Sequence, residues 1–103
     1  MITPGTTPTH TFTLPFDTSN IKSLRIFYAD DSNSNIILTK EFADATLSDN
    51  KITIRLTQAD TLLFRGYKSV RVQCQVLNYK DESFVSTAIH VGVLSSVVKE
   101  VLV

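Results

Sequence analysis

The segment Lys51-Ile52-Thr53-Ile54-Arg55-Leu56-Thr57 alternates polar and apolar side chains along its whole length. Successive side chains of a β-strand point to opposite faces of the sheet, so the apolar residues face one side and the polar residues face the other. One apolar face and one polar face are typical of an antiparallel sheet that packs on a core and meets water on its outer side. This segment therefore predicts an all-β domain.

The same alternation recurs before and after this segment. We predict further strands over residues 10–16, 21–29, 36–41, 45–47, 70–78 and 85–93. Polar, turn-forming clusters such as Asp30–Asn35 and Tyr79–Glu82 separate them. About seven short strands with frequent turns are typical of an immunoglobulin-like antiparallel β-sandwich, and a small barrel is the alternative. Thr57 stands three residues before Asp60, a spacing that predicts a capped helical turn.

The two ends differ from this central domain of residues 10–93. Residues 1–9 are rich in Thr, Pro and Gly and predict an extended N-terminal arm with little to bury. Residues 94–103 are apolar and fit a helical stripe, but four valines among these ten residues favour a strand. This C-terminal segment is expected to be either the last strand of the domain or a docking tail for a partner or a second copy.

Composition limits the classes of protein to which the chain can belong. Its 103 residues suffice for one domain, and ten basic residues balance ten acidic ones, which argues against a nucleic-acid-binding surface. Cys74 is the only cysteine, so no intrachain disulfide can form. We find no secretory signal and no long apolar run, and therefore expect a chain that folds in a reducing cytoplasm without a membrane partner.

One loop carries part of a calcium-binding pattern. Asp31, Asn33 and Asn35 match the first three ligand positions of a calcium loop, but Ile36 replaces the required glycine and Phe42 the required glutamate. We therefore expect a solvated loop.

Other reactive side chains lack the companions that chemistry needs. His10 and His90 stand far apart and have no carboxylate at a ligand-like spacing, which predicts surface or rim histidines. Cys74 falls on the apolar face of its strand and is expected to pack as a small hydrophobic residue. We predict no catalytic, cofactor-binding or metal-binding residues, and no enzymatic activity. Phe27, Tyr67 and Tyr79 could form a small glycan-binding platform, but we expect core packing or isolated exposure of these rings instead.

A family resemblance adds to this description. The opening, Ile2-Thr3-Pro4-Gly5-Thr6-Thr7-Pro8-Thr9-His10-Thr11-Phe12-Thr13-Leu14-Pro15-Phe16, resembles that of small proteins encoded in phages and prophages of gut Firmicutes. A second block, Leu56-Thr57-Gln58-Ala59-Asp60-Thr61-Leu62-Leu63-Phe64, is similar to a second segment that these proteins share, and residues 70–76 and 86–87 also fit. The resemblance covers most of the chain and implies a virion-associated structural protein. It transfers no site residue.

The expected function follows from this resemblance. It implies a non-enzymatic structural or adaptor protein of a bacteriophage particle, made in the bacterial cytoplasm and located in the virion. Its partners would be other phage structural proteins or copies of itself, with no nucleic acid, membrane, cofactor or small-molecule ligand. One of the terminal segments would add a strand to the exposed edge of a neighbour. The alternative is a β-sandwich binding module for a host-surface glycan or receptor.

Overall fold

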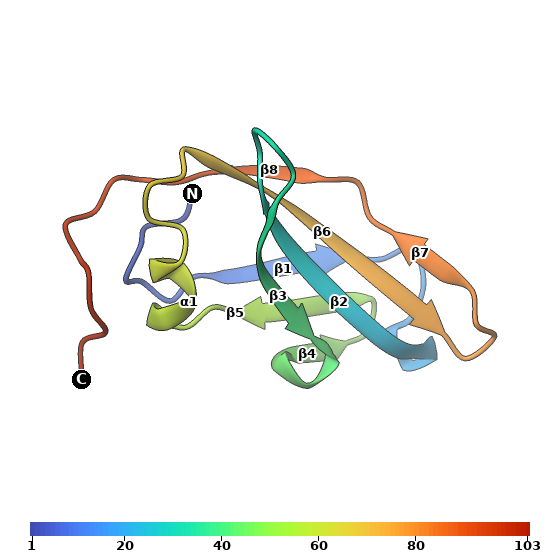
Figure 1. Cartoon of the computed structure of the whole chain (residues 1–103). Coiled ribbons are helices and arrows are strands. Elements are labelled where there is room, and N and C mark those ends of the chain that lie inside the picture. The colour runs from blue at the N-terminus through green and yellow to red at the C-terminus, as the bar shows by residue number, and fades with distance from the viewer.

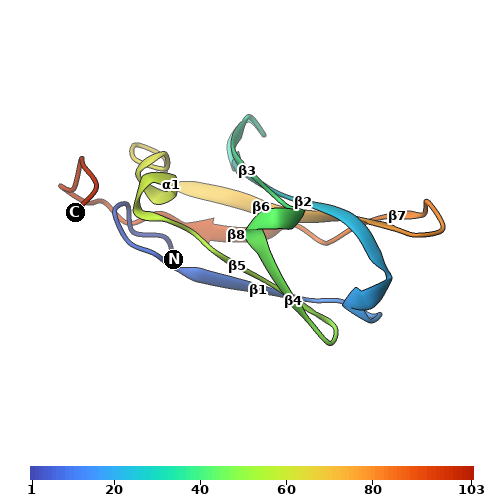
Figure 2. The same ribbon diagram turned by 90° about the horizontal axis from the view of Figure 1, so that it is seen from below.

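The computed structural model describes residues 1–103, which form two antiparallel β-sheets packed face to face (Figures 1 and 2). The strands are β1 (Thr9–Thr13), β2 (Ile21–Asp30), β3 (Ile36–Glu41), β4 (Ala45–Ser48), β5 (Lys51–Arg55), β6 (Ser69–Asn78), β7 (Ser83–Val85) and β8 (Ile89–Gly92). Single turns of helix, η1 (Thr18–Asn20), η2 (Phe42–Asp44) and α1 (Gln58–Leu62), connect some of them. None of these helices has the length and hydrophobicity needed to cross a membrane. The predicted all-β sandwich is confirmed.

The strand order follows the immunoglobulin pattern, with one strand missing. One sheet has the order β1-β5-β4, and the other has β3-β2-β6 with both β7 and β8 paired to β6. Immunoglobulin domains place strands A, B, E and D in one sheet and C, F and G in the other, with C′ added in variable domains. Here β1, β5 and β4 correspond to B, E and D, while β3, β2 and β6 correspond to C′, C and F. Strands β7 and β8 take the place of G, and no strand occupies the place of A beside β1.

The last predicted strand, residues 85–93, is interrupted. In β7, Val85 lies opposite Gln75, whereas in β8, Ile89 lies opposite Val72, so the register shifts by one residue between them. The Ser86 hydroxyl accepts a hydrogen bond from the Cys74 amide (2.9 Å). At the register shift, this hydroxyl takes the place of the backbone carbonyl that would otherwise accept from the Cys74 amide. An extra residue of this kind bends an edge strand away from its partner. The structure therefore has eight strands where the sequence predicts about seven.

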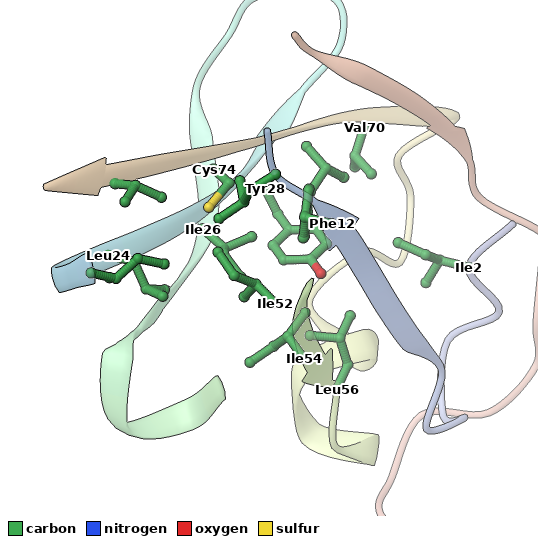
Figure 3. Packing of buried hydrophobic residues seen from close by; sticks show 14 of the residues in the cluster. Ile2, Phe12, Leu24, Ile26, Tyr28, Ile52, Ile54, Leu56, Val70 and Cys74 are labelled. Atoms are coloured by element: carbon green, nitrogen blue, oxygen red, sulfur yellow. The ribbon is translucent and has the colours of Figure 1, made fainter. Parts of the chain in front are cut away.

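The core lies between the sheets (Figure 3). One sheet contributes Phe12, Ile52 and Ile54 and the other Leu24, Ile26, Tyr28, Val70, Cys74 and Val76, all of them buried. Cys74 is 1% exposed, as its position on the apolar face predicts. The predicted cap of α1 is also confirmed, because the Thr57 hydroxyl accepts from the Asp60 amide (3.1 Å) and the Asp60 carboxylate accepts from the Thr57 amide (2.8 Å).

The N-terminal arm belongs to the domain. Ile2 is completely buried, and its amide donates to the Gly92 carbonyl (2.8 Å) while its carbonyl accepts from the Leu94 amide (2.9 Å). The expectation that residues 1–9 have little to bury is therefore wrong, because the isoleucine completes the core where β8 ends.

Residues 94–103 form neither the last strand nor a helix. They run beside α1 toward the end of the molecule opposite β7 (Figures 1 and 2).

Candidate functional site

An apolar groove follows the side of the sandwich where strand A is missing. It has a volume of about 440 Å³ and lies between β1 with its continuation to Phe16 and the strands β7 and β8. Phe12, Leu14 and Phe16 line the first wall, and Phe84, Val85 and Ile89 line the second. Because both walls belong to sheet edges, the groove opens directly into the space between the two sheets.

The β1 edge presents unpaired backbone groups to this groove. The Leu14 amide donates to the Asn50 carbonyl (2.8 Å) and the Leu56 amide to the Pro8 carbonyl (2.9 Å). Paired and unpaired positions alternate along an antiparallel strand, so Phe12 is also bonded to β5. The amides and carbonyls of Thr9, Thr11 and Thr13 therefore point away from β5. An edge of this kind is a template for an added strand.

The second wall exposes apolar side chains. Phe84 is 43% exposed and Ile89 48%, although both lie opposite buried residues of β6 and so face the space between the sheets. They are exposed because no strand covers them from the β1 side. Val85, which the alternation of residues 85–93 predicts on the same face as Ile89, instead lies opposite the exposed Gln75 and is 60% exposed on the outer face, because the register shift reverses it. The Phe84 and Phe16 rings lie 5.3 Å apart and close one end of the groove. No charged side chain lines the groove, whose polar groups are hydroxyls such as those of Thr11 and Ser86. These surroundings suit an uncharged, apolar peptide strand.

A polar cluster lies elsewhere, where the loop after β2 meets β6 and β8. His90 Nδ1 lies 2.9 Å from Asp31 Oδ1, and the Ser69 hydroxyl donates to Asp31 Oδ2 (2.9 Å). Arg71 Nε is 3.5 Å from Asp31 Oδ1, an ion pair too long for a good hydrogen bond. His90 is exposed, as the sequence predicts for a surface histidine, and its carboxylate partner is one that no local spacing could indicate. The pairing of β8 with β6 brings His90 beside Arg71 and thus close to Asp31, which is distant in sequence.

This cluster accounts for the loop that partly matches a calcium site. The Asp31 carboxylate is occupied by His90 and Ser69, and the Asn33 side chain accepts from the Asn35 amide (2.9 Å) within the loop. The oxygens therefore bond to the protein's own donors. No group of three or more His, Cys, Asp or Glu side chains converges in a way that could hold a metal ion.

Asp31 is expected to make stability depend on pH in the acidic range. Hydrogen bonds from His90, then from Ser69, lower the pKa of the Asp31 carboxyl. A carboxyl with a lowered folded-state pKa stabilises the fold above its unfolded pKa, and this contribution is lost as the pH falls through the folded-state pKa. Asp31→Asn should therefore lower the urea midpoint at neutral pH, and the difference from wild type should shrink below about pH 4. The Glu100→Gln variant, which changes the exposed C-terminal segment, is the charge-matched control. A difference that stays constant with pH would contradict this role.

His10 and Tyr28 form a second polar pair, at the boundary of the core. His10 Nδ1 lies 2.6 Å from the Tyr28 hydroxyl, and their rings are 5.7 Å apart. Burial lowers the pKa of His10 and raises the pKa of Tyr28, so both are neutral near pH 7. In that state either the tyrosine hydroxyl donates to Nδ1 or a protonated Nδ1 donates to the hydroxyl oxygen, according to which imidazole nitrogen carries the proton. Burial also raises the pKa of the Cys74 thiol to about 11, which keeps it protonated.

The three aromatic residues considered for a glycan-binding platform do not come together. Tyr67 precedes β6 and Tyr79 follows it, so the ten-residue strand separates them by about 33 Å. Tyr79 is 70% exposed and instead borders a hollow of about 310 Å³ together with Phe16 and Phe84. Phe27, on β2, is half-buried.

The apolar groove is the feature that sequence reasoning missed. The residues that line it show the alternation of an ordinary half-buried strand. Only the strand order reveals that β1 has no neighbouring strand on this side. Comparison of the chain with protein-family models, with curated proteins and with solved structures finds no match. The candidate site is therefore defined by the geometry of this chain alone.

Proposed function

We propose that this chain is a non-enzymatic structural or adaptor protein of a bacteriophage particle and assembles through protein–protein contacts. It is made in the bacterial cytoplasm and becomes part of the virion, where its partners are other structural proteins or copies of itself. The observation that carries the proposal is the open apolar groove, whose β1 edge offers free backbone hydrogen-bonding groups to an incoming strand.

The segments that resemble phage proteins lie where such a role needs them. Residues 2–16 include β1 and its continuation, which form one wall of the groove. Residues 56–64 include α1 and the buried Phe64, which stabilise the sandwich. A rigid sandwich with one edge open for a partner is a suitable building block for an assembly.

The pairing of the charged groups also supports a structural role. Lys40 Nζ and Asp60 Oδ2 lie 2.7 Å apart, and both side chains are only 14% exposed. Hydrogen bonds from Lys40 and Thr57 to its carboxylate lower the pKa of Asp60, although burial opposes them. This carboxylate and that of Asp31 thus hold elements together, in bonds internal to the fold.

Mass spectrometry of intact, purified particles from a strain that carries this gene tests the proposal. We expect the protein at a fixed ratio to the major capsid protein, and the ratio separates a many-copy head component from a few-copy tail or connector ring. A host cytosolic protein of similar abundance is the control for contamination. Absence of the chain from clean particles would contradict the proposal.

A binding module for a host-surface glycan or receptor is the second candidate. The hollow beside Tyr79 favours it, because an exposed aromatic ring lies there with polar side chains, those of Asn20, Asn78 and Glu82. Binding on a glycan array that is lost in the Tyr79→Ala variant would support this candidate, above all if the protein is absent from particles.

A further inference from the structure

We propose that the groove binds the C-terminal segment of a second copy of this chain, with residues 97–103 adding a strand to the free edge of β1. The inference names the partner for the proposed structural role and rests on that role only for its biological setting. The added strand would occupy the position that strand A holds in an immunoglobulin sandwich.

The C-terminal segment has the composition of a buried strand but is exposed in the single chain. Val97 is 93% exposed, Leu102 83% and Val103 115%, and the segment pairs with no strand. Its contacts with its own domain are few. Leu102 exchanges two hydrogen bonds with the Gln58 side chain (2.7 and 3.1 Å), and Val98 packs on Gly5. Exposed apolar segments of this kind mark interaction sites.

The length of the segment matches the groove. Along the first wall, residues 11–16 span about 20 Å, and seven extended residues, 97–103, span about 23 Å. Residues 94–96 remain as a connection of about 10 Å between the two molecules.

The charges of segment and groove also agree. The groove has no charged side chain, and the only charged side chains in the segment are the adjacent, opposite pair Lys99 and Glu100. With Val97, Val101 and Val103 facing inward, Glu100 faces water and the long Lys99 side chain can extend to the rim. The chain has zero formal net charge, so two copies do not repel each other.

The direction of the chain favours a second copy over self-insertion. The C-terminal segment leaves the fold at Val93, beyond the end of β8 that lies farther from the groove, and runs beside α1 (Figures 1 and 2). The parallel bridge between Ile2 and Val93 occupies the path along which the segment would turn back. Each copy thus has one groove to fill and one segment to donate, so the copies can form a reciprocal dimer, a closed ring or an open chain.

Sedimentation velocity of the purified full-length protein across the micromolar range tests this inference. We expect concentration-dependent association that weakens at least tenfold, about 1.4 kcal/mol, in the Val101→Asp variant. Leu102→Asp, which changes the water-facing side of the same added strand, should associate like wild type. Both positions are on an exposed segment, so thermal unfolding of the two variants should match that of wild type.

Variants of the groove test the same contact from the other side. Thr13→Pro removes an amide that points away from β5, so the sheet keeps its own hydrogen bonds while the added strand loses one. We expect this variant to be monomeric and able to fold, and Thr13→Val, which keeps the amide, to associate. A synthetic peptide of residues 94–103 should bind Val101→Asp protein but not Thr13→Pro protein.

Several outcomes would overturn the inference. They are a wild-type protein that stays monomeric, a Thr13→Pro variant that associates like wild type, and a peptide that binds both variants equally. Association through the groove together with absence from phage particles would leave the inference standing and contradict the proposed function. Presence of the chain in particles, without association of the purified protein, would contradict the inference and leave the proposed function standing.

Discussion

Replacing Tyr28 by alanine is expected to lower the free energy of unfolding by about 3–5 kcal/mol, as for other large aromatic residues in a core. The Tyr28 side chain is completely buried, and its ring lies 5.6 Å from that of Phe64 and 5.7 Å from that of His10. The residue thus joins β2, β1 and the segment after α1. Domains of this kind have a total stability of about 5–15 kcal/mol, so the variant should unfold at a much lower urea concentration.

Two variants separate the ring from its hydroxyl and from nonspecific effects. Tyr28→Phe keeps the ring but leaves His10 Nδ1 without its partner and should cost about 1–2 kcal/mol. Tyr79→Ala removes a ring that is 70% exposed and should change stability by about 0.5 kcal/mol or less. Equal effects of the two alanine variants on the urea midpoint would show that Tyr28 is not a core residue.

Ile2→Ala is expected to cost about 2–4 kcal/mol, a large effect for the second residue of a chain. The side chain is 0% exposed and packs where the N-terminal arm meets the end of β8. Truncation should leave a cavity and weaken the hold of the arm on Gly92 and Leu94. Urea denaturation followed by circular dichroism measures the loss.

Ile36→Ala is the matched control, because this isoleucine is 60% exposed and its truncation should change stability by about 0.5 kcal/mol or less. Equal stability of the Ile2→Ala variant and wild type would mean that residues 1–9 are a free arm. The result matters for assembly, because an arm bound to its own domain leaves the C-terminal segment as the strand donor.

Local patterns were sufficient to predict most of the strands. The alternation of residues 51–57 and 70–78 predicted two strands, each with one buried face, and the spacing of Thr57 and Asp60 predicted the cap of α1. These features depend on residues that are neighbours in sequence. The burial of Cys74 followed from the same alternation.

Features that depend on strand order could not be predicted in this way. Asp31 and His90 meet only because β8 pairs with β6, and Ile2 is buried only because the arm bridges to Val93. The interruption at Ser86 arises from a register shift that leaves no mark on the alternation. The groove could not be predicted for the same reason, since it exists only because no strand lies beside β1.

Hydrogen exchange at single amides of β1 tests the central claim, that this edge is open in one copy and paired in the assembly. In dilute monomer, the Thr11 and Thr13 amides should exchange rapidly, while those of Phe12 and Leu14, which bond to β5, are protected and serve as internal controls. Association, or saturation of Val101→Asp protein with the peptide of residues 94–103, should slow exchange at Thr11 and Thr13 while leaving Phe12 and Leu14 protected. Protection of Thr11 and Thr13 already in the monomer, or rapid exchange that persists in the assembly, would contradict the claim.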